Sequence, residues 1–153
     1  MKFLENRIPP PLVGLLVIIL IWLLAKVDHL IDLPPQARTF FGLLFLVSGL
    51  VVAILANIRF RKADTTINPL DPASASQLVC SGVFRYTRNP MYLGMVSLTL
   101  AATFYLSSVL SLGLVAGFAW FLQRFQIEPE ERALADLFGG EYRDYKSTVR
   151  RWI

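Results

Sequence analysis

Long runs without a charged residue constrain this chain more than any other feature. Three such runs, at residues 8–25, 39–58 and 89–123, contain 18, 20 and 35 residues. A helix that crosses a bilayer needs about 20 mostly apolar residues, with a range of about 17–25. The first two runs therefore predict one span each, and the third predicts a hairpin of two short spans with its turn at 105–111.

The runs predict an all-α membrane protein that forms one integral membrane domain over residues 1–153. A lipid-exposed segment must satisfy its own backbone hydrogen bonds, and the runs lack the alternation of a transmembrane barrel strand. A cleaved signal peptide is the alternative for the first run, but Ala25-Lys26-Val27 is a poor cleavage site. We expect four transmembrane helices and then a cytoplasmic amphipathic C-terminal helix, the four spans lying at about 9–27, 39–58, 90–106 and 108–125.

The distribution of Lys and Arg predicts the orientation. With four spans, the segment before the first span, the loop at 59–88 and the tail lie on one side of the membrane. That side holds 13 of the 15 positive charges, Lys2 among them. Because cytoplasmic segments carry the excess of Lys and Arg, we expect both termini to be cytoplasmic.

Composition excludes several classes of function. The chain has one Cys and one His, which rules out an internal disulfide framework and His-cluster metal sites, and we expect no metal. It contains neither a GxGxxG nor a GxxxxGK[ST] motif. The net charge of +4 suits an anionic surface, and 55% hydrophobic residues favour a membrane over nucleic acid as that partner.

The first polar segment that carries chemistry is 75–94. Asn89-Pro90 predicts an N-cap and a first helical residue at the membrane surface, where free N–H groups attract anions. Arg85 and Arg88 lie beside this helix start. With the aromatic residues around it, the segment suits an anionic aromatic small molecule, or it is only an interfacial belt; the aromatic residues are Phe84, Tyr86 and Tyr92.

The second polar segment, 126–145, repeats the pattern of a helix start. Pro129 suits the first helical turn, and Glu130 and Glu131 there complement the helix dipole. Gly139-Gly140 predicts a stop, beyond which an apolar stripe suits the membrane surface. A capped amphipathic helix without a ligand is the alternative. Two carboxylates near lipid need a cation, which is either a ligand or one of Arg85, Arg88 and Arg124.

Small residues predict where spans approach one another. Gly113 and Gly117 form a small-xxx-small pair, and the second span contains a similar group. Ordinary membrane-helix composition is the alternative for both groups. The residues of the second group are Ser48, Gly49, Ala53 and Ala56.

Two stretches together resemble a known family. SGVFRYTRNPMYLG, followed about 35 residues later by EPEERALADLFGGEYRDYKSTVRRW, resembles the isoprenylcysteine carboxyl methyltransferase and phospholipid methyltransferase families of membrane enzymes. The resemblance covers residues 75–153, which it marks as the cofactor-binding catalytic half. It implies S-adenosylmethionine as methyl donor at the cytoplasmic face. It also implies a lipophilic acceptor: an isoprenylcysteine-like carboxylate, a phospholipid amine, or a small hydrophobic acid or thiol.

The resemblance also implies roles for individual residues. Phe84 stands where an aromatic residue contacts the cofactor, and Glu131, helped by Glu130, matches the carboxylate that holds it. Arg88 suits the cofactor carboxylate, and Tyr86 or a neighbouring ring suits the adenine or the sulfonium. By position, the adenosine side of the cofactor corresponds to Ser76, Gln77, Leu78 and Val79. The family's H-P-x-Y element corresponds to Asn89, Pro90, Met91 and Tyr92.

Catalytic roles are expected for Glu130, Arg124 and Asn89. Asn89 stands where the family pattern more often has His, and an amide is no general base near neutral pH. Glu130 is then the group that takes a proton from an amine acceptor. Arg124 is the nearby candidate for gripping a substrate carboxylate.

Two other functions remain open at this point. A sterol-type membrane reductase that uses NADPH carries a similar element, although a phosphate-rich cofactor prefers cations to the Glu130-Glu131 pair. A non-catalytic membrane assembly protein is the second alternative. The gathering of polar motifs on one predicted face argues against it.

Overall fold

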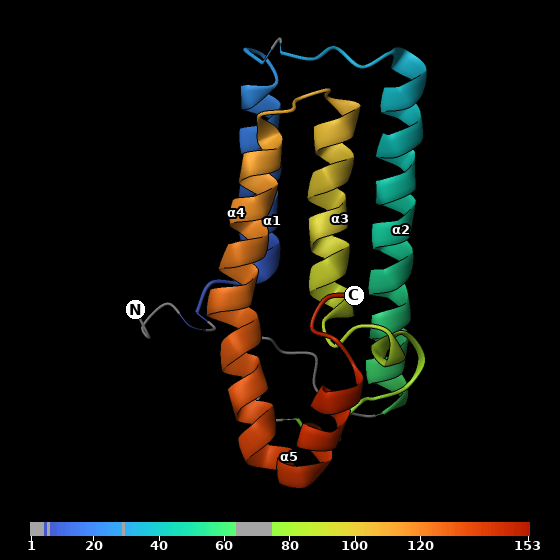
Figure 1. The fold of residues 1–153 in the computed structure, drawn as a ribbon, viewed down its shortest axis with the longest axis vertical. Helices are drawn as coiled ribbons and strands as arrows, with labels where there is room; N and C mark the ends of the chain where they lie inside the picture. The colour runs from blue at the N-terminus through green and yellow to red at the C-terminus, as the bar shows by residue number, and fades with distance from the viewer. Residues whose placement is uncertain (1–4, 6, 29, 64–74) are drawn as a thin grey trace.

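The computed structural model describes residues 5, 7–28, 30–63 and 75–153, and every regular element within them is helical, as predicted. The four predicted spans each form a helix, α1 to α4 (Figure 1). Lys2, which the charge count includes, lies outside the described residues. The elements are α1 (Pro10–Leu24), α2 (Pro35–Lys62), the short 3-10 turn η3 (Gly82–Arg85), α3 (Pro90–Tyr105), α4 (Ser111–Leu122), the π-helical turn η4 (Gln123–Ile127) and α5 (Glu128–Thr148).

Proline marks the first turn of four of these helices. Pro10, Pro35, Pro90 and Pro129 each stand at the first or second helical position. Proline is suited to this place because the first N–H groups of a helix have no partner within it, and its fixed φ is already helical. These prolines therefore set where α1, α2 and α3 begin.

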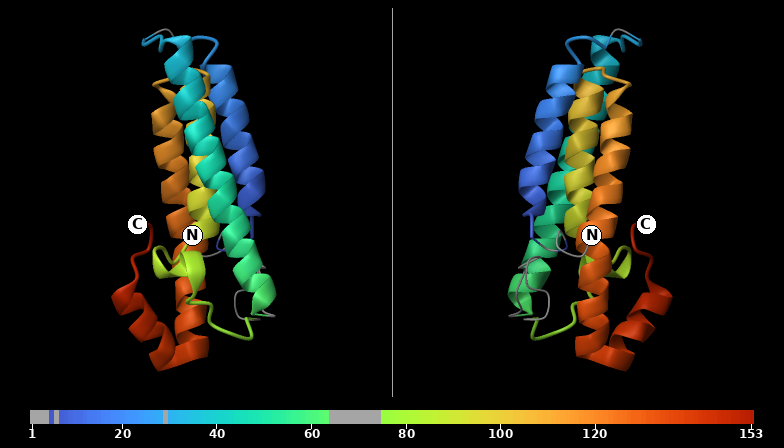
Figure 2. Two further views of the ribbon diagram at one scale, coloured as in Figure 1. Left: turned by 90° about the vertical axis from the view of Figure 1, so that its right-hand side faces the viewer. Right: turned by 90° about the vertical axis from the view of Figure 1, so that its left-hand side faces the viewer.

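Helix α3 lies at the centre of the bundle. Helices α1 to α4 run side by side, and α3 packs against α2, α1 and α4 (Figures 1 and 2). The main core is apolar, and α1, α3 and α4 supply most of it. Its buried members are Val17, Ile21, Tyr92, Val115, Phe118, Leu122 and Ile127.

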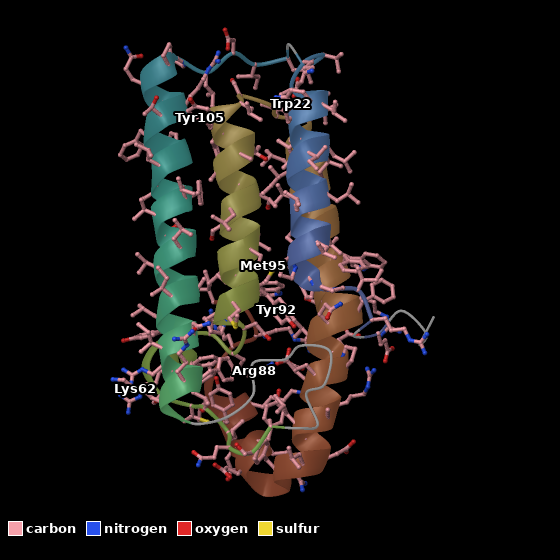
Figure 3. The ribbon with its side chains drawn as sticks, turned by 180° about the vertical axis from the view of Figure 1, so that it is seen from behind. Trp22, Lys62, Arg88, Tyr92, Met95 and Tyr105 are labelled. Carbon is pink, nitrogen blue, oxygen red and sulfur yellow. The ribbon has the colours of Figure 1, made fainter. Side chains whose placement is uncertain are left out.

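The outer surfaces of α1 and α2 are also apolar. Leu12, Leu16, Leu43 and Ile54 are all more than half exposed. Within the described residues, α2 is the one helix that is long and apolar enough to cross a membrane, and α1 is a shorter apolar helix. The 28 residues of α2 rise about 42 Å, which exceeds the roughly 30 Å of the hydrocarbon core. Trp22 and Tyr105 lie near one end of the bundle, and Lys62 and Arg88 near the other (Figure 3).

A polar network joins the two connections at one end of the bundle. Ser107 separates α3 from α4 in a tight turn, which confirms the turn predicted at 105–111. The carboxylate of Asp28 accepts hydrogen bonds from Ser108 Oγ and Leu110 N, each at 2.9 Å. Ser107 Oγ accepts a bond from Leu33 N at 2.8 Å. The α1–α2 and α3–α4 connections are therefore held together.

Glycines allow α2 and α3 to approach closely. A Cβ built on Gly49 would lie 2.9 Å from the carbonyl oxygen of Gly94, and a Cβ on Gly94 would lie 2.9 Å from that of Gly49. The contact predicted for the second span is thus confirmed. At Gly113 and Gly117, by contrast, an added Cβ meets nothing within 4 Å, so this pair makes no close helix contact within the described chain.

The predicted break between the fourth span and a C-terminal helix is wrong. Helix α4 continues through η4 into α5, and the direction changes only at Gly139, whose φ is 53° (Figure 1). In a regular α-helix the ring of Pro129 would clash with the carbonyl of Phe125 and leave it without a donor. The wider π turn lies directly before Pro129 and absorbs this conflict. The predicted stop at Gly139-Gly140 is confirmed as a kink.

The glycine contact predicts opposite effects for the same substitution at two places. Gly49→Ala should lower the free energy of unfolding by about 1–3 kcal/mol, because the new methyl group meets backbone that cannot easily move. Gly113→Ala should leave stability unchanged or raise it by up to about 1 kcal/mol through helix propensity. Thermal unfolding in detergent, followed by tryptophan fluorescence, measures both. Equal melting temperatures for the two variants would contradict the packing described.

Candidate functional site

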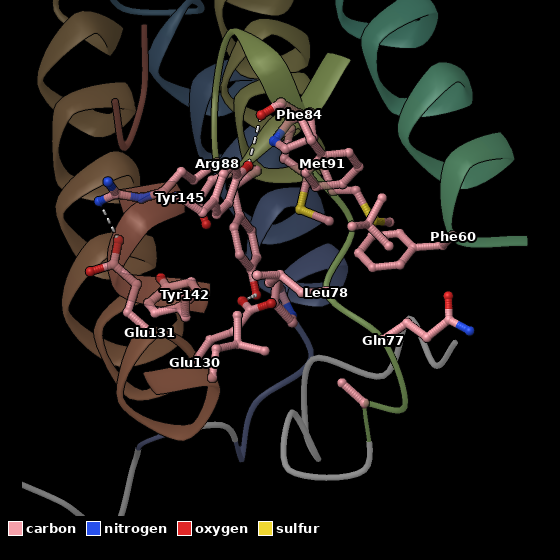
Figure 4. Close-up of a pocket in the computed structure, with 18 of the residues that line it drawn as sticks. Phe60, Gln77, Leu78, Phe84, Arg88, Met91, Glu130, Glu131, Tyr142 and Tyr145 are labelled. Atoms are coloured by element: carbon pink, nitrogen blue, oxygen red, sulfur yellow. Dashed lines mark hydrogen bonds and ion pairs between the residues drawn. The ribbon is translucent and has the colours of Figure 1, made fainter. Parts of the chain in front are cut away.

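A cavity of about 190 Å³ lies where α3 begins, between α3, α5 and the end of α2 (Figure 4). Its wall is mostly apolar and aromatic, with a few polar side chains. Helices α1, α2, α3 and α5, the turn η3 and the loops on either side of that turn contribute to it. The lining residues are Pro10, Pro11, Phe60, Ala75, Gln77, Leu78, Val79, Phe84, Arg88, Asn89, Pro90, Met91, Tyr92, Met95, Glu130, Glu131, Leu134, Tyr142 and Tyr145.

Glu130 presents a partly buried carboxylate to this cavity. Tyr92, one turn into α3, donates its hydroxyl hydrogen to Glu130 Oε2 at 3.1 Å. Burial raises the pKa of Glu130 to about 7, and the hydrogen bond from Tyr92 opposes that shift in part. A carboxylate in this state changes between its neutral and charged forms near physiological pH.

The neighbouring Glu131 also lines the cavity, but its carboxylate is paired with Arg88 and Arg151. Arg88 Nη2 donates to its Oε1 at 2.8 Å, and Arg151 Nη2 donates to its Oε2 at 2.7 Å. The side chains of Arg88 and Glu131 are each only 8% exposed. Burial alone would raise the pKa of Glu131, but the bonds from Arg151 and Arg88 outweigh it and hold the pKa below its usual range.

The tail of the chain closes this side of the site. Asn89 occupies the predicted N-cap position, but its side chain makes no capping bond and instead donates to the carbonyl oxygen of Arg151 at 2.9 Å. Arg88 N donates to the carbonyl oxygen of Arg150 at 3.0 Å, and Trp152 Nε1 donates to Gln123 at 3.2 Å. The predicted amide cap is therefore replaced by a strap between the start of α3 and the tail.

A further bond fixes η3 against α5. The hydroxyl of Tyr145 donates to the carbonyl oxygen of Phe84 at 2.8 Å, and the ring of Phe84 packs edge-on against Phe60 at 5.2 Å between centroids. These contacts hold the aromatic wall of the cavity between α2 and the returning half of α5 (Figure 4).

The structure brings most of the predicted site residues together. Ser76, Tyr86 and Arg124 are the exceptions and do not line the cavity. Ser76 is exposed, Tyr86 is 76% exposed, and Arg124 pairs with Glu128 at 3.0 Å. The predicted residues that do line it are Gln77, Leu78, Val79, Phe84, Arg88, Asn89, Pro90, Met91, Tyr92, Glu130 and Glu131.

Sequence reasoning missed several lining residues. Phe60 follows Arg59, the first charged residue after the second uncharged run. Tyr142 and Tyr145 belong to the apolar stripe beyond Gly139-Gly140, which the sequence predicts to lie on the membrane surface. All three are aromatic residues within polar segments next to a predicted membrane span. An aromatic ring in such a place is a signal that could have indicated a binding site. The proline pair that opens α1 gives no such signal, because its contact with α3 depends on tertiary packing.

Comparison with known proteins places the chain in a family. A family model described as phospholipid methyltransferase matches residues 37–141. The chain belongs to this family. Its members are S-adenosylmethionine-dependent membrane methyltransferases. The match includes α3, α4 and the first half of α5, which carry Tyr92, Glu130 and Glu131.

Individual relatives of this family member agree. An uncharacterised protein of Haemophilus influenzae is 44% identical over 64 residues, which are 41% of this chain and all of that protein. Protein-S-isoprenylcysteine O-methyltransferases of Dictyostelium discoideum and Saccharomyces cerevisiae are 29% and 28% identical over 75% and 77% of this chain. The aligned part spans only 50% and 49% of those two enzymes. No solved structure gives a significant match.

The pairing of Glu131 predicts a large loss of stability when it is broken. Glu131→Gln should lower the free energy of unfolding by about 3–5 kcal/mol, because it leaves the buried Arg88 without a counter-charge. Since the folded pKa of Glu131 is depressed, the wild-type stabilisation is present above the unfolded pKa and is lost as pH falls through the folded one. Thermal unfolding across the acid range measures both effects.

A matched control is available in the same helix. Glu128→Gln removes a carboxylate that pairs with the half-exposed Arg124 outside the cavity, and it should cost no more than about 1 kcal/mol. If both variants lost the same stability, the buried network would have no special role.

Proposed function

We propose that this protein is an S-adenosylmethionine-dependent methyltransferase that methylates a lipophilic acceptor at the cytoplasmic membrane face. The observation that carries the proposal is the cavity that holds the carboxylate of Glu130 beside Tyr92, two residues that both lie within the segment matching the family model. The proposal includes the four-span topology, with α1 to α4 in the bilayer and η3, α5 and the tail on the cytoplasmic side.

The residues present fit this cofactor, which combines two cationic groups, a carboxylate and an adenine. Glu130 offers a partly buried negative charge to a cation. Arg88 lines the cavity, and its Nε is a buried donor that has no hydrogen-bond partner. A buried unpaired N–H is costly unless a ligand or water completes it, so this atom suits the cofactor carboxylate. The rings of Phe84 and Tyr142 are available to the adenine.

Within this proposal the adjacent glutamates have different roles, although the sequence predicts that both hold the cofactor. Glu131 holds Arg88 and Arg151 in place, so it is a positioning residue. Glu130 binds the cation and is the candidate catalytic residue. Leu78 and Val79 also line the cavity.

The bound cofactor supplies a methyl group that the positive sulfur already activates. The chain's residues hold the two reactants in line and exclude water, which is where most of the acceleration arises. An amine acceptor must lose its proton before its nitrogen attacks. Glu130, with a pKa of about 7, would take that proton first and so leave the nitrogen with a free electron pair for the methyl group.

The cavity wall supports a lipophilic acceptor. Pro10 of α1, Phe60 of α2 and Met95 of α3 all line it, so its apolar side reaches the helices whose outer faces are apolar. Two observations favour an amine among the acceptors. Glu130 is placed to accept a proton, and Arg124, the predicted grip for a substrate carboxylate, lies outside the cavity.

The alternatives receive less support. An NADPH-dependent reductase needs several cations for its phosphate groups, whereas Arg88 is the one cationic side chain among the described residues that line the cavity, and Glu131 already neutralises its charge. A purely structural assembly role leaves the carboxylate of Glu130 in the cavity without a purpose. The methyltransferase family match favours the same choice.

Binding of S-adenosylmethionine should depend on pH through Glu130. Because only the ionised carboxylate attracts a cation, raising the pH from 5.5 to 7 should tighten binding about tenfold. Isothermal titration calorimetry of the purified protein in detergent measures this change. Glu130→Gln should bind weakly at every pH in this range.

The control is Glu128→Gln, which removes a carboxylate two residues away and outside the cavity. It should keep both the affinity and the pH dependence of the wild type. A pH dependence that survives in Glu130→Gln would remove this residue from the cation site.

Methyl transfer itself is tested with a labelled donor. Wild-type protein, supplied with S-adenosylmethionine that carries a tritiated methyl group, should label a component of a total membrane extract that partitions into organic solvent. Glu130→Gln should reduce the rate by about 10²-fold or more if it removes the general base. Label found only in water-soluble products would refute a lipophilic acceptor.

A further inference from the structure

A second hollow lies between the end of α2 and η3, and it is separate from the cavity that contains Glu130. It is lined by Leu55, Arg59, Gly82, Val83, Arg85 and Tyr86, and it shares no lining residue with the first cavity. Its floor is apolar and its rim carries two guanidinium groups and a phenol. The charged end of α2 and the turn η3 meet here (Figure 2).

Among the described residues, the two arginines of this hollow have no counter-charge. Neither the Arg59 nor the Arg85 guanidinium makes an ion pair or hydrogen bond within the part of the chain that the structure describes. Gly82 has a φ of 64°, and a Cβ there would lie 2.3 Å from Arg59 Nε. The missing side chain is what lets the guanidinium rest against the backbone of η3.

An apolar stripe leads along α2 to this hollow. Val47, Val51, Leu55 and Arg59 follow at intervals of four residues and therefore lie on one face of the helix. Val47 is 55% exposed, Val51 47% and Leu55 46%. The stripe is about 18 Å long, slightly more than the roughly 15 Å of one hydrocarbon leaflet. Arg59 is the first residue beyond the uncharged run.

We propose that this hollow binds an anionic phospholipid. Its phosphate lies between Arg59 and Arg85, the hydroxyl of Tyr86 donates to it, and one acyl chain follows the stripe on α2. The described residues that line the hollow include no carboxylate, so the ammonium of a zwitterionic headgroup finds no partner there. The inference goes beyond the proposed function. It depends only on α2 crossing the bilayer, and it holds whether or not the protein transfers methyl groups.

Native mass spectrometry of the full chain in detergent tests the proposal. The probes are dioleoylphosphatidylglycerol, dioleoylphosphatidylcholine and glycerol 3-phosphate, which carries the phosphate without acyl chains. Phosphatidylglycerol should bind more tightly than phosphatidylcholine, and glycerol 3-phosphate should not displace it at equal concentration. Arg59→Gln and Arg85→Gln should each weaken phosphatidylglycerol binding about fivefold, and together more than about tenfold.

Arg61→Gln is the matched control, because Arg61 lies in the same last turn of α2, is exposed, and does not line the hollow. It should change the affinity by less than about twofold. An equal loss in Arg61→Gln would mean diffuse surface attraction and overturn the proposal. Equal binding of the two lipids, or displacement by glycerol 3-phosphate, would overturn it as well. Both of these comparisons use the wild-type protein, so they do not depend on the folding of a variant.

Discussion

The ion pair of Glu131 with Arg88 and Arg151 is the interaction on which the arrangement of the site depends. It joins three parts of the chain that are distant in sequence: the start of α3, the first half of α5 and the tail. Without it, Arg88 would be a buried charge with no partner, and the strap formed by the tail would lose its strongest contact.

Two adjacent carboxylates therefore have opposite electrostatic states. Glu131 is surrounded by cations and its pKa lies below the usual range, while burial raises the pKa of Glu130 to about 7. Such a separation between neighbouring acids is a common basis for dividing structural and chemical roles. Here the division follows from direction alone, since successive residues of a helix point about 100° apart.

Much of this fold follows from local patterns in the sequence. Uncharged runs predict where the helices of the bundle lie, Asn89-Pro90 predicts the start of α3, and Gly49 and Gly139-Gly140 predict a close contact and a stop. The continuation of α4 into α5 could not be predicted this way. Pro129 is typical of a helix start, and only a π turn, which has no sequence signature, makes an uninterrupted helix possible at that place.

The site was predictable in its membership more than in its pairing. Most of the predicted residues, from Gln77 to Tyr92 and at Glu130 and Glu131, line one cavity, whereas Ser76, Tyr86 and Arg124 do not. Which glutamate faces the cavity depends on the phase of α5, and which cation holds Glu131 depends on a partner 43 positions away and another in the tail. Neither fact is encoded in a short motif.

The π turn at η4 also has a consequence for how related chains should be aligned. A π turn accommodates one residue more than the α-helical turn it replaces. A relative that lacks one residue between positions 123 and 127, and that has no proline at the place of Pro129, would therefore form a plain helix there and still direct its two acidic side chains as this protein does. An alignment of two such chains therefore needs a one-residue gap at this place. Without that gap, the alignment would match Glu130 to the wrong acidic residue of the relative.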